Sequence, residues 1–304
     1  MEQVPAVSVL MPVYNAERYV AEAVESILKQ TFTDFEFLIV NDGSTDRSLQ
    51  ILQSYAEQDL RIHLISRENR GLVATLNEMI NLARAPLLAR MDADDIAMHD
   101  RLEIQTRHLE NHPEVVCVGG GCQVIDEHGR FLIIADIKTG PDIVEQLALQ
   151  GVTPITHPTA LMRTSAIKAV KGYSDKDWPA EDLSLWIKLC DLGKIDNAPE
   201  IVLQYRIHDQ SISTTQHALQ IRKISEICAE ACKKRGVQLP LLAQVGRASR
   251  SRQSKYKIIL RHGWWAFSSS EFKTAFIYGF RATILSPFKD GGWRLMACAI
   301  LKRK

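Results

Sequence analysis

The 304-residue sequence lacks the marks of a secreted, disulfide-bonded or membrane-spanning protein. Its six cysteines form no Cys-x-x-Cys pair and no regular framework, which argues against a zinc knuckle or a disulfide scaffold. No segment reaches the roughly 18 to 20 apolar residues that a membrane-spanning helix needs. The N-terminal residues also lack the basic start and long apolar stretch of a signal peptide. We therefore expect a cytoplasmic protein.

The chain has almost no net charge, but its charges are unevenly distributed. The 37 Lys and Arg residues against 36 Asp and Glu residues give +1, which disfavours a generally basic nucleic-acid binder or an acidic solvating chain. Residues 1–232 carry −13, whereas residues 233–304 carry +14. The basic part also holds three of the five tryptophans. An acidic body is therefore joined to a basic, aromatic-rich C-terminal region.

Apolar runs and amphipathic segments alternate through the first hundred residues and predict an α/β fold. Strands are predicted at 7–13, 35–40, 62–65 and 87–91, with helices between them, which implies a parallel sheet. Shorter, antiparallel strands are predicted at 115–118, 123–126 and 131–135, the first two separated by Gly119, Gly120 and Gly121. Later helices are predicted at 180–192, 221–234, 241–262, 271–285 and 293–302. We expect a catalytic domain over residues 1–215 and a helical region over residues 216–304.

Three carboxylates follow the predicted strand 87–91, where ligands collect in sheets of this kind. Asp92, Asp94 and Asp95 lie within four residues and would repel one another. A divalent cation would relieve this repulsion, since Mg²⁺ and Mn²⁺ prefer carboxylate oxygens and often share phosphate ligands. The alternative is a capped turn with solvated carboxylates and no metal.

Two further acidic positions are candidates for binding and catalysis. Asp42 ends a neighbouring strand, and its carboxylate can accept the N3–H of uracil or thymine; the alternative is a helix cap in an Asn-Asp-Gly turn. Glu181 and Asp182 begin an apolar-faced helix, where a desolvated carboxylate can act as a general base. The alternative is that they only stabilise the helix N-terminus. His157 and His208, taken singly, favour structural, hydrogen-bonded roles.

Taken in order, these motifs resemble the family 2 inverting glycosyltransferases of the GT-A fold. The segments that carry the resemblance are Val7 to Asp46, Glu68 to Asn77, Arg90 to Gln105, His157 to Arg163 and Gly172 to Leu189, with a further familial segment from Tyr205 to Ser213. The resemblance covers about residues 5–215 and is specific because its five main segments are ordered. It implies a Rossmann-like, mixed and mainly parallel sheet flanked by helices, with a helical C-terminal extension.

The resemblance also implies roles for individual residues. The nucleotide-sugar site is expected to comprise Pro12, Tyr14, Glu17, Asp42, Asn69, Gly71, Asp92, Ala93, Arg206 and Ser211. Asp94 is the expected direct ligand of Mn²⁺ or Mg²⁺, with Asp92 and His208 as further candidates. Asp182 matches the family's catalytic base, and Glu181 positions it or contacts the acceptor. The family's Ala-Arg-Asn-like triplet is here Ala74-Thr75-Leu76-Asn77, a departure from the pattern.

The implied reaction is metal-dependent, inverting transfer of a sugar from a UDP- or dTDP-linked donor to a hydroxyl of a lipid-linked glycan, in surface polysaccharide synthesis. One alternative is a sugar-phosphate nucleotidyltransferase, which is disfavoured because no Gly-rich, Lys- or Arg-bearing loop follows the first strand. The other is a catalytically silent, membrane-tethered scaffold that binds nucleotide.

The C-terminal region combines clustered cations with many aromatic residues. Cationic helices with an aromatic face bind anionic membrane surfaces, each cation contributing about 1 kcal/mol near the bilayer. We expect peripheral attachment to the inner face of the cell membrane, which would bring a lipid-linked acceptor to the active site. The alternative is that the aromatics pack on the core and the cations pair with the acidic body. No nucleic-acid partner is expected, because no known binding module is recognisable.

Overall fold

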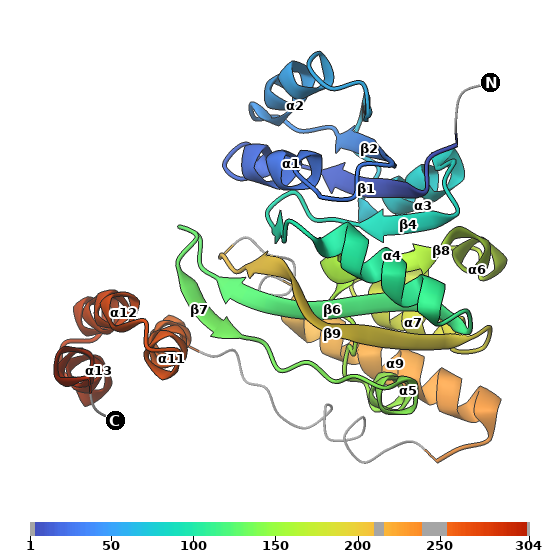
Figure 1. Ribbon diagram of the computed structural model, residues 1–304. Coiled ribbons are helices and arrows are strands. Elements are labelled where there is room, and N and C mark those ends of the chain that lie inside the picture. The colour runs from blue at the N-terminus through green and yellow to red at the C-terminus, as the bar shows by residue number, and fades with distance from the viewer. Residues whose placement is uncertain (1–3, 210–215, 239–253, 303–304) are drawn as a thin grey trace. The chain divides into compact units, whose positions relative to one another are not determined.

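The computed structural model describes residues 4–209, 216–238 and 254–302, and its contacts divide the chain into two compact units (Figure 1). The first unit comprises residues 1–122, 136–204 and 212–247. The second comprises residues 123–135, 205–211 and 248–304. The contacts thus divide the chain at places other than residue 215, where the sequence analysis places the end of a catalytic domain.

A mixed β-sheet forms the centre of the first unit. Strand β1 (Val7–Val13) pairs in parallel with β2 (Phe35–Asp42) and β4 (Leu87–Arg90), and β3 (Ile62–Arg67) pairs in parallel with β2. The strand order is β3-β2-β1-β4-β8-β6-β9-β5, and the pairs β4–β8, β8–β6 and β9–β5 are antiparallel. The later strands are β5 (Ile96–Ala97), β6 (Val115–Ile125), β8 (Leu161–Arg163) and β9 (Lys194–Arg206). Because helices flank this sheet, the predicted fold class is confirmed (Figure 1).

The helices of the first unit are amphipathic, and their apolar positions pack against the sheet. In α1 (Val20–Leu28), the residues Val20, Ala23, Val24 and Ile27 recur at helical spacing and are fully buried. The core cluster joins β-strand residues to Leu76 and Met79 of α3 (Leu72–Leu82) and to Trp186 of α7 (Glu181–Leu189). The remaining helices are α2 (Ser48–Ala56), α4 (Arg101–Asn111), α5 (Pro141–Leu149), α6 (Thr164–Ala169) and α9 (His217–Arg235).

The three consecutive glycines in β6 do not form a turn. The prediction of separate strands at 115–118 and 123–126 is wrong, because one strand runs through Gly119, Gly120 and Gly121. A Cβ atom on Gly119 would lie 2.2 Å from Asn197 Oδ1, and one on Gly120 would lie 2.5 Å from Val202 Cγ2. Both of these partners belong to β9. The glycines therefore let another strand pass close to β6, a common reason for glycine inside a strand.

The second unit combines a β-hairpin with three helices. Strand β7 (Phe131–Ile134) pairs antiparallel with the end of β6, and α11 (Lys255–Ser268), α12 (Phe272–Leu285) and α13 (Asp290–Leu301) complete the unit. A buried cluster joins Val124 and Leu132 of the hairpin to Tyr256, Phe267 and Tyr278 of the helices. The helices predicted at 271–285 and 293–302 are therefore confirmed. The predicted helix 241–262 falls partly outside the described residues, and its described part begins at Lys255.

Within the ranges that the structure describes, no helix has both the length and the apolar character needed to cross a bilayer.

Candidate active site

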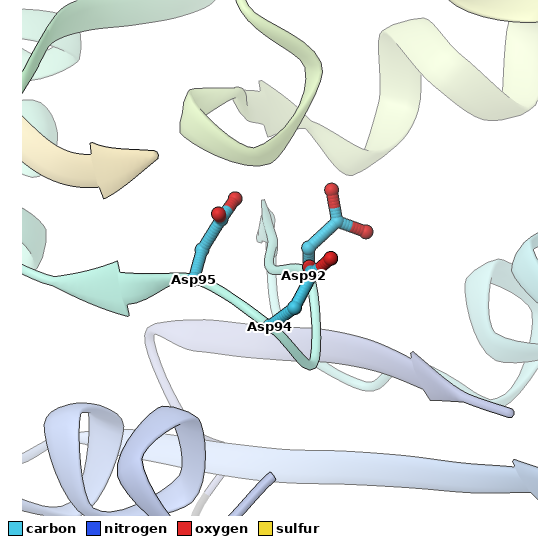
Figure 2. Close-up of side chains that lie close together, drawn as sticks. All are labelled: Asp92, Asp94 and Asp95. Atoms are coloured by element: carbon cyan, nitrogen blue, oxygen red, sulfur yellow. The ribbon is translucent and has the colours of Figure 1, made fainter. Parts of the chain in front are cut away.

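The three aspartates that follow β4 form one cluster. A carboxylate oxygen from each of Asp92, Asp94 and Asp95 lies within 4.8 Å of the others, on the loop between β4 and β5 (Figure 2). Asp95 is buried, whereas Asp92 and Asp94 are half-buried. An oxygen-only donor set of this kind fits a hard divalent cation such as Mg²⁺ or Mn²⁺. The structure thus brings these three residues together, and the assignment of Asp94 as the direct ligand remains a prediction.

A buried cation that was not predicted lies beside this cluster. Arg90, the last residue of β4, is only 3% exposed and forms an ion pair with Asp92. Burial alone would lower the pKa of Arg90, but the charges of Asp92 and Asp95 hold it above its ordinary value. Its Nε is buried without a hydrogen-bond partner among the described residues. The sequence does hold a signal for this residue: an arginine stands two residues before the first aspartate of the cluster, at the end of an apolar strand.

The main chain of Arg90 is fixed on both sides. Its N–H donates to the Ala160 carbonyl at 2.9 Å, and its own carbonyl accepts from Arg101 Nη2 at 2.7 Å. Arg101 is itself fully buried. The main chain of Arg90 is therefore held between the segment before β8 and helix α4.

The carboxylates at the start of α7 are held in a desolvated environment. Burial raises the pKa of Glu181 to about 7, and the neighbouring charge of Asp182 adds to this rise. Burial also raises the pKa of Asp182, although its Oδ1 accepts a hydrogen bond from the Leu183 N–H at 2.7 Å. The charge of Arg90 opposes the rise at both carboxylates. A carboxylate with a pKa shifted toward neutrality is suited to accept a proton.

Glu181 has one further unusual feature. Its side chain is only 6% exposed, and its Oε2 atom has no hydrogen-bond partner in the described part of the chain. An unsatisfied buried acceptor costs stability, so its retention is more typical of a functional site than of helix capping.

His157 has the structural role that its isolated position in the sequence favours. Its Nε2 lies 2.8 Å from the Tyr173 hydroxyl, and its ring packs edge-on against Trp186. Burial, followed by the charge of Arg90, keeps the pKa of His157 well below its ordinary value. His157 is therefore a neutral, hydrogen-bonded residue of the core.

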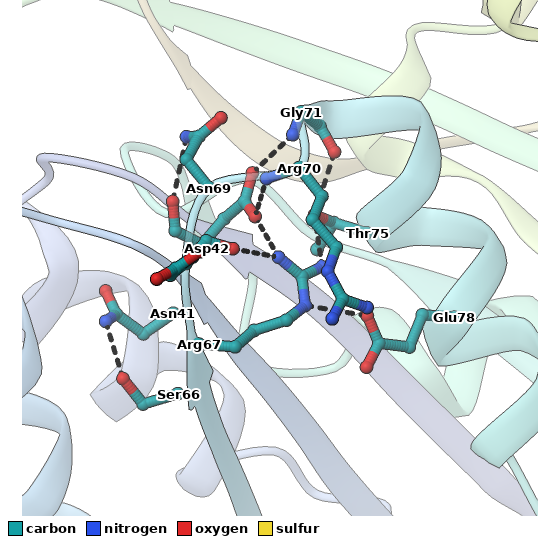
Figure 3. Close-up of polar contacts among 10 residues, drawn as sticks. Asn41, Asp42, Ser66, Arg67, Asn69, Arg70, Gly71, Thr75 and Glu78 are labelled. Atoms are coloured by element: carbon teal, nitrogen blue, oxygen red, sulfur yellow. Dashed lines mark hydrogen bonds and ion pairs between the residues drawn. The ribbon is translucent and has the colours of Figure 1, made fainter.

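Asp42, at the end of β2, organises the loop that leads into α3 (Figure 3). Its Oδ1 accepts from the Arg70 N–H at 2.8 Å and forms an ion pair with Arg67. Its Oδ2 accepts from the Gly71 N–H at 3.0 Å, and its carbonyl accepts from Asn69 Nδ2 at 2.8 Å. Because a carboxylate oxygen can accept two hydrogen bonds, Oδ2 retains capacity for one more donor. The structure thus joins three predicted site residues, Asp42, Asn69 and Gly71.

Arg67 was not predicted, and it connects Asp42 to helix α3. Its Nη2 donates to Thr75 Oγ1 at 2.9 Å and its Nε donates to Glu78 at 2.8 Å (Figure 3). Asn77 of the same helix, where the sequence departs from the family pattern, has a structural role. Its side-chain amide exchanges two hydrogen bonds of 2.9 Å with the main chain of Tyr173.

The predicted residues after β1 lie next to Asp42 in the sheet, because β1 pairs in parallel with β2. Pro12 is opposite Val40 in this pairing. Tyr14 follows the strand and is 55% exposed. Glu17 accepts hydrogen bonds from the N–H and the Nε of Arg47, at 3.0 and 3.3 Å. The carboxyl ends of β1, β2 and β4 therefore present the predicted residues at one edge of the sheet.

Three of the predicted residues do not belong to the described part of the first unit. Arg206 and His208 belong to the second unit, where Arg206 is 3% exposed and its Nη1 lies 3.5 Å from the Asp126 carbonyl. Ser211 lies outside the described residues. Their contacts with nucleotide or metal remain predictions.

Comparison with known proteins identifies the family. A model of "Glycosyl transferase family 2" matches residues 8–170, which contain the carboxylate cluster and Asp42. The chain belongs to glycosyltransferase family 2. This family 2 glycosyltransferase is 34% identical over 241 residues to an uncharacterised glycosyltransferase of Haemophilus influenzae, which covers 76% of this chain and 74% of the relative.

Two solved structures share the fold of this glycosyltransferase. TarS 1-349 of S. aureus in complex with UDP-GlcNAc has a TM-score of 0.61 at 17% identity, covering 98% of this chain and 92% of that chain. The mannosyltransferase PcManGT of Pyrobaculum calidifontis, in complex with GDP-Man and Mn²⁺, has a TM-score of 0.57 at 18% identity. That alignment covers 99% of this chain and 81% of that chain. At these identities the likeness concerns the fold alone.

Proposed function

We propose that this family 2 glycosyltransferase is a metal-dependent, inverting enzyme. It transfers a sugar from a UDP- or dTDP-linked donor to a hydroxyl group of a lipid-linked glycan acceptor in surface polysaccharide synthesis. The observation that carries the proposal is the carboxylate cluster after β4, which shares the charge of Arg90 with Glu181 and Asp182. The loop proposed to bind the metal and the proposed catalytic base therefore both interact electrostatically with the buried side chain of Arg90.

Asp42 is the residue proposed to recognise the nucleobase of the donor. Its Oδ2 has capacity to accept the N3–H of a uracil or thymine ring, while its other hydrogen bonds hold the loop with Asn69 and Gly71 in place. The exposed ring of Tyr14, together with Pro12 and Glu17, completes the proposed nucleoside pocket. The TarS complex with UDP-GlcNAc supports a uridine donor, whereas the PcManGT complex with GDP-Man indicates that this fold also accommodates a purine.

Asp94 and Asp92 are the residues proposed to hold Mn²⁺ or Mg²⁺, with Ala93 between them at the donor and His208 as a further ligand. When bound, the ion supplies Lewis acidity that neutralises the departing diphosphate. Arg206 and Ser211 are proposed to contact that diphosphate. The Mn²⁺ in the PcManGT complex supports a metal in a protein of this fold.

Asp182 is proposed to take the proton from the acceptor hydroxyl as its oxygen attacks the anomeric carbon. Attack from the face opposite the diphosphate inverts the configuration in a single displacement. The raised pKa of Asp182 suits this role, because the carboxylate accepts a proton more readily than an ordinary aspartate. Glu181 positions Asp182 or contacts the acceptor.

The enzyme is proposed to act at the inner, cytoplasmic face of the membrane. The C-terminal region would bind the anionic surface there and bring a lipid-linked acceptor within reach of Asp182. Nucleic acid is not part of this proposal.

Replacement of the proposed base tests the mechanism. Asp182→Asn should lower turnover on the order of 10²- to 10⁴-fold, since the amide cannot accept the proton. Turnover is measured as UDP release from a panel of UDP-linked sugars offered with alkyl glycosides. Binding of UDP with Mn²⁺, measured by titration calorimetry, should stay within about twofold of the wild type, because the base contacts the acceptor and not the nucleotide.

The matched control is Glu181→Gln, one residue away, which should lose less turnover than Asp182→Asn. Full turnover in Asp182→Asn would contradict the base assignment. Pyrophosphate release from a sugar phosphate and UTP would identify a nucleotidyltransferase instead, and UDP binding without release of UDP from any donor would identify a silent scaffold.

A further inference from the structure

Helices α12 and α13 direct large apolar side chains outward as well as inward. Positions such as Ala275, Tyr278 and Ala282 of α12 and Leu295 and Ala299 of α13 are buried in the cluster of the second unit. The opposite positions carry side chains that are 39% to 103% exposed: Phe276, Phe280 and Ile284 of α12, Phe288 of the connecting turn, and Trp293, Ile300 and Leu301 of α13. We call these seven residues the outer apolar face. Soluble monomers seldom expose so many large apolar side chains on one pair of helices.

Small residues carry the inner packing of these helices. A Cβ atom on Gly279 of α12 would lie 3.0 Å from the Gly292 carbonyl of α13, so the two helices approach backbone to backbone. A Cβ atom on Gly263 of α11 would lie 2.4 Å from a methyl carbon of Leu295. Small residues thus allow the close inner contacts. Of the outer aromatic residues, Trp293 donates its Nε1–H to the Pro287 carbonyl at 3.0 Å, in the turn before α13.

Exposed cations accompany the outer apolar face. Residues 254–302 contain eight Lys and Arg residues but only two acids, Glu271 and Asp290. Lys273, Lys289, Arg294 and Lys302 are exposed on or beside α12 and α13. The last three also lie over aromatic rings, 4.6, 6.0 and 5.8 Å from the ring centroids of Tyr256, Trp264 and Phe272. A surface that combines apolar side chains with an excess of cations is complementary to the phosphates and upper acyl chains of an anionic bilayer.

We propose that the outer apolar face inserts among the headgroups of an anionic bilayer, while Lys273, Lys289, Arg294 and Lys302 pair with lipid phosphates. The inference rests on the proposed function, because it assigns a particular surface to the membrane that carries the acceptor. Insertion would be shallow, since no described helix is able to cross the bilayer. A second copy of the chain fits this surface less well, because a two-fold contact would oppose the same cations to one another.

Vesicle binding by the full chain tests this surface. The wild type should sediment with vesicles of equal parts phosphatidylcholine and phosphatidylglycerol, should not sediment with phosphatidylcholine alone, and should dissociate as salt is raised. The double variant Phe280→Ser/Trp293→Ser should bind the anionic vesicles at least about tenfold more weakly, because two inserted aromatic side chains are lost. Leu60→Ser is the matched control: Leu60 is 95% exposed but belongs to the first unit, so its replacement should leave vesicle binding unchanged.

Two results would overturn the assignment. One is a wild type that does not bind anionic vesicles at low salt. The other is a wild-type dimer, seen by light scattering, that the double variant converts to monomers without any change in vesicle binding.

UDP binding with Mn²⁺ separates this inference from the proposed function. The double variant should bind UDP as the wild type does, which also shows that the first unit remains folded. A wild type that has normal turnover but does not bind vesicles would contradict only the proposed membrane-binding surface. Vesicle binding by a protein that binds no nucleotide would support the surface and contradict the transferase.

Discussion

At the scale of single residues, Arg90 supplies buried positive charge to the acidic site. One buried guanidinium is ion-paired with Asp92 and acts electrostatically on Asp95, Glu181 and Asp182. Buried charges are tolerated only when they are paired. Arg90 thus interacts with carboxylates from two separate elements, the β4 loop and the start of α7, and the charge of Arg101 also interacts with Asp95.

Arg90→Gln should destabilise the metal-free protein by about 3 kcal/mol, because it leaves buried carboxylates without their cation. Mn²⁺ should recover part of that loss, since an ion bound at the cluster replaces the missing charge and stabilises the folded state. The measurement is urea unfolding in EDTA and in Mn²⁺. Arg84→Gln is the control: it removes an exposed partner of Glu36, with an Nε–Oε2 distance of 2.7 Å, and its effect should not depend on metal. An equal loss for Arg90→Gln in EDTA and in Mn²⁺ would contradict this account.

The carboxylates of the site were predictable, but their partners were not. Asp92, Asp94 and Asp95 lie within four residues of the sequence, so their proximity could be expected without knowledge of the fold. Arg101 and Ala160 hydrogen-bond the main chain of Arg90, and only the folded chain brings them to β4. The pairing of Asp42 with Arg67 likewise depends on the register of β2 and β3.

At the scale of secondary-structure elements, segments with strong apolar periodicity were predicted well. Elements that depend on contacts with distant parts of the chain were not. Helices α1 and α3 and strands β1 to β4 carry clear apolar patterns, and they form close to the predicted positions. Strand β9 was not predicted, because its 13 residues include polar positions and Pro199, which disfavour a strand reading. The glycines of β6 were misread for a different reason: the need for small residues comes from β9, which only the folded chain brings close to β6.

Gly120→Ala should lower the free energy of unfolding by about 1–3 kcal/mol, because the new Cβ would lie 2.5 and 2.9 Å from the two methyl carbons of Val202. Val202→Ala removes both methyl groups and should recover part of this loss in the Gly120→Ala background. Denaturant unfolding of the four proteins gives the coupling energy of the pair. Strictly additive effects would show that β9 does not approach β6 in this way.

At the scale of the whole molecule, the near-zero net charge includes several separate ion pairs between basic and acidic side chains. Lys234 and Arg235 of α9 pair with Asp191 in the first unit, at 2.8 and 2.7 Å. Lys255 and Arg281 pair with acids of the second unit, Asp209 and Glu127. Part of the basic region is therefore compensated inside each unit, as the alternative to membrane binding predicted. The exposed cations beside the outer apolar face are the remaining candidates for an external anionic surface.

The central claim is that the carboxylate cluster and Asp42 bind a nucleoside-diphosphate sugar together with a divalent cation. A thermal-shift screen of nucleotide sugars in Mn²⁺ and in EDTA tests it directly, since a donor that binds the folded state raises its melting temperature. We predict that UDP- or dTDP-linked sugars raise the melting temperature in Mn²⁺ but not in EDTA, and that Asp94→Ala abolishes this rise. No rise with any nucleotide sugar, or a rise that persists in both EDTA and Asp94→Ala, would contradict the account.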